Sequence, residues 1–257
     1  MKGKLILFFS LIVITGYSQP KYIAHRGASY LAPENTVASA KLGWELGADA
    51  VEVDVHLSKD NRVMVIHDKS TKRTCQGKNM AVKSSPSIIL RDLDAGSFKS
   101  EKYKGEKIPF LSEIIDIIPE GKKLVVEIKC GKEVIPCLER ILEKSDKSGQ
   151  IVFISFGWDT IVETKKHFPD NACYWLSAIK PGLKKRMRKA SEIGLEGVNL
   201  KHSLIDEKVM ALAEELKLKV LAWTVDDPEE AKRLTGLGVT HITTNRPKWL
   251  KDEVEKR

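Results

Sequence analysis

Short apolar segments alternate with amphipathic segments along most of the chain, and this alternation constrains the fold more than any other feature. Segments rich in β-branched and aliphatic residues lie at 21–26, 50–57, 62–66, 123–129, 151–155, 172–176, 197–200, 219–225 and 241–244. Stretches with helical periodicity lie between them, at 35–47, 111–118, 132–145, 158–168, 182–194, 206–217 and 227–238. Near-continuous apolar strands are typical of a parallel sheet covered on both faces. The alternation therefore predicts a parallel α/β architecture.

The number of repeats separates a closed barrel from an open sheet. The segment 62–66 follows 50–57 after only SKDN, which is typical of a hairpin turn and not of a helical crossover. Without it, one strand from each repeat gives eight strands, and eight such units in a chain of 257 residues predict a TIM (β/α)8 barrel. The alternative is an open doubly wound sheet, which more often carries a glycine-rich dinucleotide turn; the sequence contains no Gly-x-Gly-x-x-Gly.

Residues 69–109 do not follow the repeat, because they hold many charges and the turn formers Gly77, Pro86, Gly96 and Gly105. We interpret the region at about 57–110 as a small subdomain inserted after the second strand. It would lie on the face where barrels keep their chemistry, within one domain that spans 19–257.

The first residues predict a secretory signal peptide over 1–18. Lys2 and Lys4 precede an apolar run at 5–15, and small residues follow at Gly16 and Ser18. The alternative is an uncleaved membrane anchor, although the run is short for spanning a bilayer. We expect an exported protein, periplasmic or secreted, without a transmembrane span after signal cleavage.

The four cysteines are Cys75, Cys130, Cys137 and Cys173. Export permits disulfides, and four cysteines allow three connectivities that the sequence does not distinguish. Cys130 and Cys137 are the pair we expect if any bridge forms, since they flank a short turn after the third barrel strand. Four free thiols are the alternative. The absence of a Cys-x-x-Cys pair disfavours a thiolate metal site.

The formal net charge of +8 favours anionic partners such as phosphates. The lysines are scattered, however, and the one dense basic run, KKRMRK at 184–189, is typical of a solvated helix face. The charge is therefore a weak signal by itself, and we expect no nucleic-acid partner.

Three acidic residues occupy predicted strand interiors. Strand periodicity places Glu52, Asp54 and His56 on one face of the segment 50–57. Glu127 and Lys129 share a face of the next parallel strand, so the three carboxylates should converge in a barrel. Buried carboxylates are costly without compensation, and a hard divalent cation such as Mg²⁺ or Ca²⁺ would compensate them. The alternative is that they pair with lysines at the barrel rim.

Two histidines end predicted strands where loops begin. His25 closes the first strand, and His67 closes the hairpin strand. A pair of imidazoles flanking one electrophile can serve as general base and general acid near neutral pH. The other four histidines have no assigned role: His56 faces the carboxylates, His167 and His202 look loop-borne, and His241 begins a strand at the opposite end.

Arg26 and Gly27 follow His25 directly. A guanidinium offers a planar fork of donors that matches phosphate or carboxylate. A glycine allows a sharp turn or a close backbone approach to a ligand. The end of this strand therefore combines a group that can transfer a proton, a group that can bind an anion and a backbone position that can turn sharply.

With these residues in view, the chain resembles the glycerophosphodiester phosphodiesterase family. The resemblance rests on AHRGASYLAPENT (24–36), GADAVEVDVHLSKDNRVMVIHD (47–68), LDAGSFKSEKYKGEKIPFLSE (93–113), LVVEIK (124–129), AWTVDD (222–227) and GVTHITTNRP (238–247). The order and spacing of these motifs from about residue 21 to the C-terminus make the match highly specific.

The resemblance implies a TIM barrel with a small insert after the second strand, and hydrolysis of glycerophosphodiesters to sn-glycerol 3-phosphate and an alcohol. It implies one divalent cation bound by Glu52, Asp54 and Glu127. It further implies acid and base roles for His25 and His67. The remaining implied roles are phosphate binding by Arg26 and Lys129 and contact with the glycerol moiety by Trp223.

One residue departs from the family pattern. Family members often end the last strand with an aspartate before x-Pro, and this chain has Asn245, which keeps the acceptor oxygen and loses the charge. Because the acidic trio and both histidines are intact, we expect an active enzyme. Two other hypotheses stay open: a phospholipase-type activity on lysophospholipids or inositol phospholipids, and a non-catalytic glycerophosphodiester-binding protein, which would need a broken acid–base pair.

Overall fold

The computed structural model describes residues 19–256, and the predicted signal peptide lies outside the described residues. Within this range, eight parallel strands form a closed barrel: β1 (Lys21–Ala24), β2 (Ala50–Leu57), β4 (Lys123–Ile128), β5 (Ile151–Ser155), β6 (Ala172–Ser177), β7 (Gly197–Lys201), β8 (Lys219–Trp223) and β9 (His241–Thr244). The order is β1-β9-β8-β7-β6-β5-β4-β2, and pairing of β1 with β2 closes the ring. The predicted TIM barrel is confirmed.

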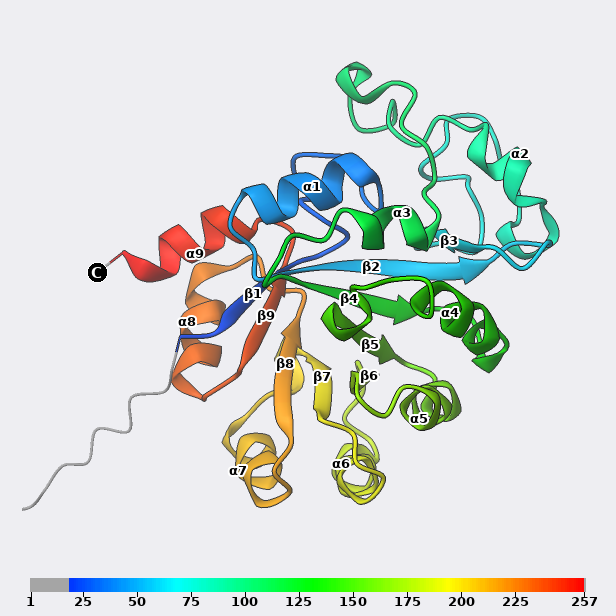
Figure 1. Cartoon of the computed structure of the whole chain (residues 1–257). Helices are drawn as coiled ribbons and strands as arrows, with labels where there is room; N and C mark the ends of the chain where they lie inside the picture. The colour runs from blue at the N-terminus through cyan, green and yellow to red at the C-terminus, as the bar shows by residue number, and fades with distance from the viewer. Residues whose placement is uncertain (1–18, 257) are drawn as a thin grey trace, which may run out of the picture.

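The extra strand β3 (Val63–Val65) stands outside the ring. It runs antiparallel to β2, with Val55 opposite Val65 and Leu57 opposite Val63. The predicted hairpin is therefore present, and it extends β2 beyond the barrel wall (Figure 1).

The helices surround the strands, as Figure 1 shows for α4 to α8. Their bounds are α1 (Val37–Glu45), α2 (Ser87–Arg91), α3 (Leu111–Asp116), α4 (Ile135–Leu142), α5 (Trp158–His167), α6 (Leu183–Glu192), α7 (Glu207–Glu215), α8 (Pro228–Gly236) and α9 (Pro247–Glu255). Short 3₁₀ turns are η1 (Val82–Ser84), η2 (Glu101–Tyr103), η3 (Lys132–Val134), η4 (Ser148–Gln150) and η5 (His202–Leu204).

Helix α9 was not predicted from the sequence; it has a proline in its first turn and buries Leu250 against the barrel. The loop positions predicted for two histidines were also wrong. His167 is the last residue of α5, and His202 begins η5, so neither lies in an irregular loop.

Period-two alternation divides the apolar residues into two layers. Val51, Val53 and Val55 are fully buried between the strands and the helices. The opposite faces of the strands fill the barrel interior with a smaller cluster: Ile23, Ala50, Val125, Ile154, Tyr174, Leu176 and Leu221. The polar residues of β2 belong to this inner face, so they are held at the barrel axis.

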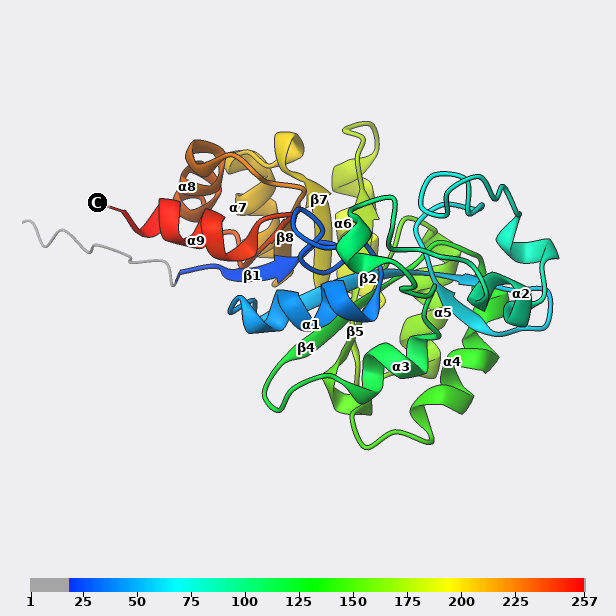
Figure 2. The same ribbon diagram turned by 90° about the horizontal axis from the view of Figure 1, so that it is seen from above.

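The insert has an apolar cluster of its own, formed by Met64, Ile66, Cys75, Val82, Leu90, Leu93, Ala95 and Ile108. It projects from the end of β2, opposite to the C-terminal helix α9 (Figure 2). Two hydrogen bonds tie it to the loop after β1: Lys99 Nζ donates to the Ser29 carbonyl at 2.7 Å and the Tyr103 hydroxyl donates to the Leu31 carbonyl at 3.2 Å. The subdomain thus covers one side of the barrel mouth.

The four cysteines of residues 19–256 are free thiols, so the Cys130–Cys137 bridge is not formed. Cys137 lies inside α4, where the Arg140 guanidinium approaches its sulfur at 3.1 Å. Within residues 19–256, each helix is too short or too polar to cross a bilayer.

Candidate active site

Three carboxylates meet inside the barrel at the carboxyl ends of β2 and β4. The register places Asp54 directly opposite Glu127, with Glu52 one inward position before Asp54. One oxygen of each lies within 4.8 Å of the others, and all three residues are buried. Burial and mutual repulsion raise the pKa of Glu52 well above its usual range and that of Glu127 to about 7. The predicted convergence is confirmed.

This group fits a divalent cation. Glu52 Oε1 and Asp54 Oδ1 are buried side-chain atoms without a hydrogen-bond partner anywhere in residues 19–256. An unpartnered buried carboxylate oxygen is costly, and a hard cation ligated by oxygen satisfies it directly. Among the described residues this is the only such acidic, histidine or cysteine group compact enough to hold a metal ion.

Two positively charged side chains, Lys129 and Arg26, compensate part of the negative charge of the three carboxylates. Lys129 Nζ donates to Glu127 Oε1 at 2.8 Å and lies 3.3 Å from Asp54 Oδ1, while Arg26 Nε lies 3.3 Å from Asp54 Oδ2. Although burial raises the pKa of Asp54, Lys129 and Arg26 hold it below its usual range. The alternative of carboxylates paired with lysine is therefore correct in part, but two cations do not satisfy every oxygen of three carboxylates.

The turn at Arg26 and Gly27 brings the backbone over β2. Arg26 has φ of +55° and Gly27 has φ of +79°. A Cβ at Gly27 would lie 2.4 Å from the backbone carbon of Ser39, so a glycine is required here. The Arg26 amide donates to Glu52 Oε2 at 2.8 Å, which fixes that carboxylate. The left-handed conformation of an arginine is a strained feature of the kind that gathers at active sites.

Asn35 is a site residue that the sequence analysis quoted but did not assign. Its Nδ2 donates to Asp54 Oδ2 at 2.8 Å, and its Oδ1 accepts from the Asp54 amide at 3.0 Å. The residue is buried and has φ of +58°. Asn35 therefore orients Asp54 from the start of α1. The signal was the tolerance of asparagine for the left-handed region, directly before a helix cap.

His25 follows β1, and hydrogen bonds hold both its backbone and its ring. Its backbone amide donates to the Thr244 carbonyl at 2.9 Å, and its ring Nδ1 lies 2.7 Å from Asn245 Oδ1. Burial and the adjacent Arg26 lower the pKa of His25. A ring that is neutral near pH 7 can accept a proton.

His67 follows β3 and contacts a carboxylate instead of an amide. Its Nδ1 lies 2.6 Å from Asp68 Oδ1, and Arg73 Nε donates to Asp68 Oδ2 at 2.7 Å. Arg73 also donates to both oxygens of Glu34, which in turn accepts from Arg26 at 2.9 Å. A charged network from the insert thus connects His67 with Arg26, and the sequence analysis did not foresee it.

His56 acquires a structural role. Its Nε2 lies 3.1 Å from the His67 carbonyl, and burial lowers its pKa. A buried imidazole that bonds to this carbonyl steadies the end of the hairpin, and so the position of His67.

Trp223 ends β8 on the same side of the barrel. Its Nε1 donates to the Asn199 carbonyl at 3.3 Å, and its ring packs edge-on against Phe156, with centroids 5.4 Å apart. Lys129 Nζ lies 5.9 Å from the Phe156 ring centroid. The two aromatic rings form an apolar wall beside Lys129. Phe156 is 44% exposed and was missed, because a lone aromatic at a strand end carries no motif.

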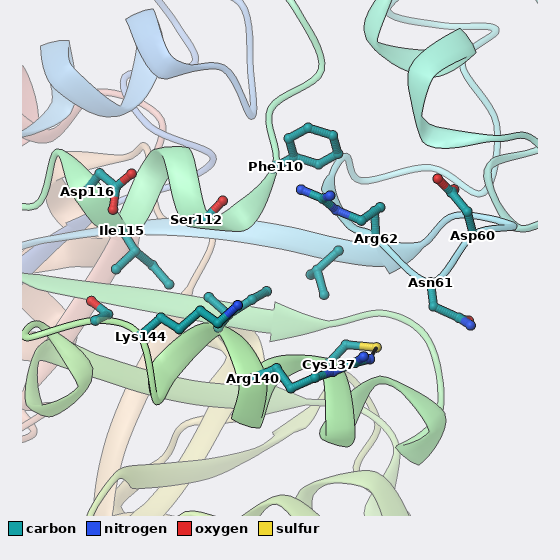
Figure 3. A pocket seen from close by; sticks show the side chains of 13 residues that line it. Asp60, Asn61, Arg62, Phe110, Ser112, Ile115, Asp116, Cys137, Arg140 and Lys144 are labelled. Carbon is teal, nitrogen blue, oxygen red and sulfur yellow. Dashed lines mark hydrogen bonds between the residues drawn. The ribbon is translucent and has the colours of Figure 1, made fainter.

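A prominent hollow elsewhere does not belong to this site. It has a volume of about 480 Å³ and lies between the β2–β3 hairpin, α3 and α4 (Figure 3). Arg62, Arg140 and Lys144 face it, and none of the predicted site residues lines it.

Comparison with known proteins agrees with this geometry. The model of the glycerophosphoryl diester phosphodiesterase family matches residues 25–249. A glycerophosphodiester phosphodiesterase of Caldanaerobacter subterraneus subsp. tengcongensis is 34% identical over 245 residues, which cover 91% of this chain and 97% of the relative. The chain belongs to the glycerophosphodiester phosphodiesterase family.

Solved structures of the family share the barrel. An Oleispira antarctica phosphodiesterase, in complex with the product sn-glycerol-3-phosphate, superimposes with a TM-score of 0.85 at 31% identity, over 93% of this chain and 98% of that one. A Parabacteroides distasonis glycerophosphodiester phosphodiesterase has a TM-score of 0.77 at 24% identity, over 93% and 98% of the two chains, and so supports the fold.

Proposed function

We propose that this chain hydrolyses glycerophosphodiesters to sn-glycerol 3-phosphate and an alcohol, with one divalent cation, Mg²⁺ or Ca²⁺, and two histidines as acid and base. The observation that carries the proposal is the buried trio of Glu52, Asp54 and Glu127, in which two oxygens have no hydrogen-bond partner within residues 19–256. Both histidine-bearing segments reach the trio, because the Arg26 amide, next to His25, donates to Glu52 and the Ile66 amide, next to His67, donates to the Asp54 carbonyl. The match to a family named for this activity supports it.

Arg26 and Lys129 would bind the phosphate of the substrate. Both side chains already lie beside the acidic trio, and the buried Arg26 Nε has no hydrogen-bond partner in the described part of the chain. A guanidinium and an ammonium on one phosphate stabilise the charge that grows on its oxygens in the transition state. A cation held by the three carboxylates would polarise the same phosphoryl group as a Lewis acid.

The partners of the two histidines favour different roles. His25 faces a neutral amide and the cationic Arg26, which suits a neutral ring that accepts a proton. His67 lies beside the Asp68 carboxylate, an acceptor that orients the ring through Nδ1. We assign His25 as the base for the attacking hydroxyl and His67 as the acid for the leaving alcohol.

The attacking group would be the glycerol C2 hydroxyl. Its oxygen forms a bond to phosphorus while His25 takes its proton, and the bond from phosphorus to the leaving alcohol breaks as His67 supplies a proton. Water then opens the cyclic phosphate with the roles of the histidines reversed. Trp223 would present its ring to the glycerol carbons, beside Phe156.

We also propose that the protein is exported, after cleavage of residues 1–18. Mass spectrometry of the protein recovered from the periplasm or medium of an expressing cell checks this. A mature chain that begins near Gln19 is expected, and an intact N-terminus in the cell membrane would contradict it.

The decisive assay measures release of sn-glycerol 3-phosphate from glycerophosphocholine, glycerophosphoethanolamine and glycerophosphoinositol. Turnover should disappear in EDTA and return with Mg²⁺ or Ca²⁺; full turnover in EDTA would exclude the cation. Glu127→Gln should lower cation affinity and turnover together, whereas Glu133→Gln, the same change at an exposed site nearby, should alter neither.

His67→Ala should lower turnover about 10²- to 10⁴-fold, the usual contribution of a general acid or base. A variant with near wild-type turnover would remove His67 from the mechanism. Binding of the substrate by the wild type without release of product would favour the binding protein, and turnover of lysophospholipids alone would favour the phospholipase-type enzyme.

A further inference from the structure

We propose that Asp226 and Asn245 are positioning residues for His25, and that together they fix which nitrogen of its ring carries the proton. The inference rests on the proposed role of His25 in proton transfer. It gives Asn245, the residue that departs from the family pattern, a defined task, and it assigns one to Asp226, in the loop that follows β8.

Three side chains form a continuous chain of hydrogen bonds across the ends of β8, β9 and β1. Asp226 Oδ2 accepts a short hydrogen bond from Asn245 Nδ2. Asn245 Oδ1 lies 2.7 Å from His25 Nδ1 and also accepts from the Ser29 hydroxyl at 2.9 Å. The three elements are neighbours in the barrel, and β9 lies between the other two (Figure 1).

The carboxylate decides how the amide is turned. A carboxylate only accepts hydrogen bonds, so it must face the NH₂ end of Asn245. The opposite orientation would place the amide oxygen against Asp226 Oδ2 with no hydrogen between them, and would point the NH₂ group at the Ser29 hydroxyl and His25. Asp226 therefore directs Asn245 Oδ1 toward the imidazole.

The amide in turn decides the tautomer. Since Asn245 Oδ1 carries no hydrogen, His25 Nδ1 must be the donor in the 2.7 Å contact. In the neutral ring the lone pair then resides on Nε2, the nitrogen that can accept a proton. In water the neutral histidine side chain prefers the reverse arrangement, with Nε2 protonated, so the contact selects a minor tautomer.

Asp226 is itself held rigidly. Its Oδ1 accepts from the Thr244 hydroxyl at 2.7 Å and from the Asn245 backbone amide at 2.8 Å. Both donors belong to the end of β9, so the carboxylate cannot turn away without losing three hydrogen bonds. The hydrogen bonds from Asp226 through Asn245 to His25 therefore form a fixed network, in which the orientation of each side chain depends on its neighbour.

The uncharged side chain of Asn245 also keeps the Asp226 carboxylate away from the His25 ring. The charged groups that act on His25 are Arg26, which lowers its pKa, and Asp54 and Glu34, which raise it. Asn245 interposes an amide between the Asp226 carboxylate and the imidazole. An aspartate at position 245 would bring the charge into direct contact and stabilise the protonated ring.

The test compares kinetics of four proteins on glycerophosphocholine. Asp226→Asn removes the charge that orients the amide, and kcat should fall about 10- to 100-fold, the loss seen when a group that orients a metal-ligating histidine is removed, with KM changed less than about 3-fold. Asn245→Ala, which deletes the acceptor, should give the same loss. The matched control is Asp227→Asn, the same change one residue along, where the side chain caps α8 and asparagine caps equally well; its kcat should match the wild type.

The exchange variant D226N/N245D provides the rescue. It restores one carboxylate and one amide with their places exchanged, so the ring again has an acceptor at Nδ1. Its kcat should recover most of the loss, and the acidic limb of its kcat/KM profile should move to higher pH, because the carboxylate now contacts His25. A purely structural role would give neither rescue nor movement of the limb. An exchange variant that folds and stays as slow as D226N would overturn the proposal.

Nitrogen-15 NMR of the histidine rings tests the tautomer in the wild type, independently of any variant. His25, assigned by its loss in His25→Gln, should show a protonated Nδ1 and a bare Nε2 near pH 7.5. Protonation at Nε2 instead would overturn the proposal, even if Asp226→Asn failed to fold. If the wild type hydrolysed no glycerophosphodiester, the proposed function would fail while the predicted tautomer could still be observed.

Discussion

His241→Gln should make the protein more resistant to acid without changing its chemistry. His241 begins β9, at the end of the barrel opposite the active site, where its Nδ1 lies 3.0 Å from the Thr240 hydroxyl. Burial, together with Lys21 and Lys219, lowers its pKa to about 4, and Asp49 offsets only part of this. The folded state therefore holds this ring neutral.

The sign of the effect follows from linkage. The unfolded chain protonates His241 below its usual pKa of 6.5, whereas the folded chain resists protonation until about pH 4. The contribution to stability is therefore complete above pH 6.5 and is lost as the pH falls toward 4. One pKa unit corresponds to about 1.4 kcal/mol, so the whole shift is worth about 3 kcal/mol, of which about 2 kcal/mol is lost between about pH 7.5 and pH 5.

Urea unfolding at about pH 7.5 and about pH 5, monitored by tryptophan fluorescence, measures how much unfolding free energy each protein loses on acidification. Wild type should lose about 2 kcal/mol more than His241→Gln on acidification. His167→Gln is a control of opposite sign, because Glu139 raises the pKa of that exposed histidine, which stabilises the fold at low pH. Parallel losses in wild type and His241→Gln would refute the argument, as would a change in turnover at neutral pH.

Three further variants test the site. Gly27→Ala should lower both the melting temperature and turnover, because its Cβ would overlap the Ser39 backbone; near wild-type values in a thermal scan and the activity assay would contradict the close approach. Arg73→Gln should cost about 10-fold or more in turnover with little loss of stability, since it releases Glu34; unchanged kinetics would exclude the network from function. Trp223→Ala should raise KM for glycerophosphocholine more than it lowers kcat, and an unchanged KM would place the glycerol elsewhere.

The sequence predicted the architecture because the relevant signals are local. Strand periodicity of two is a property of neighbouring residues, so Glu52 and Asp54 could be placed on one face before any contact was known. Parallel pairing of adjacent barrel strands then brings Glu127 opposite Asp54. The final helix α9 was not predicted, because each helix was identified as the segment between two strands. Among residues 19–256, no strand follows Thr244, so the last helix was not enclosed by a strand pair.

The partners of the site residues could not be predicted in this way. His25 and Asn245 are 220 positions apart, and Arg73 reaches Glu34 across 39 positions. These contacts depend on how loops fold at the barrel mouth, including the left-handed backbone of Arg26 and Asn35. Neither hydrophobic periodicity nor a motif of a few residues encodes the direction of such loops.

In the proposed mechanism, the acid and base roles of His25 and His67 follow from the groups that contact them. His25 and His67 are chemically identical, and each lies beside an oxygen through Nδ1, so geometry alone makes them equivalent. The oxygen of Asn245 is neutral and that of Asp68 is anionic, and this difference in charge is the basis on which His25 is proposed as the base and His67 as the acid. An asparagine at position 245 therefore fits the proposed role of His25 as the base, with the Asp226 charge held one side chain away from the ring.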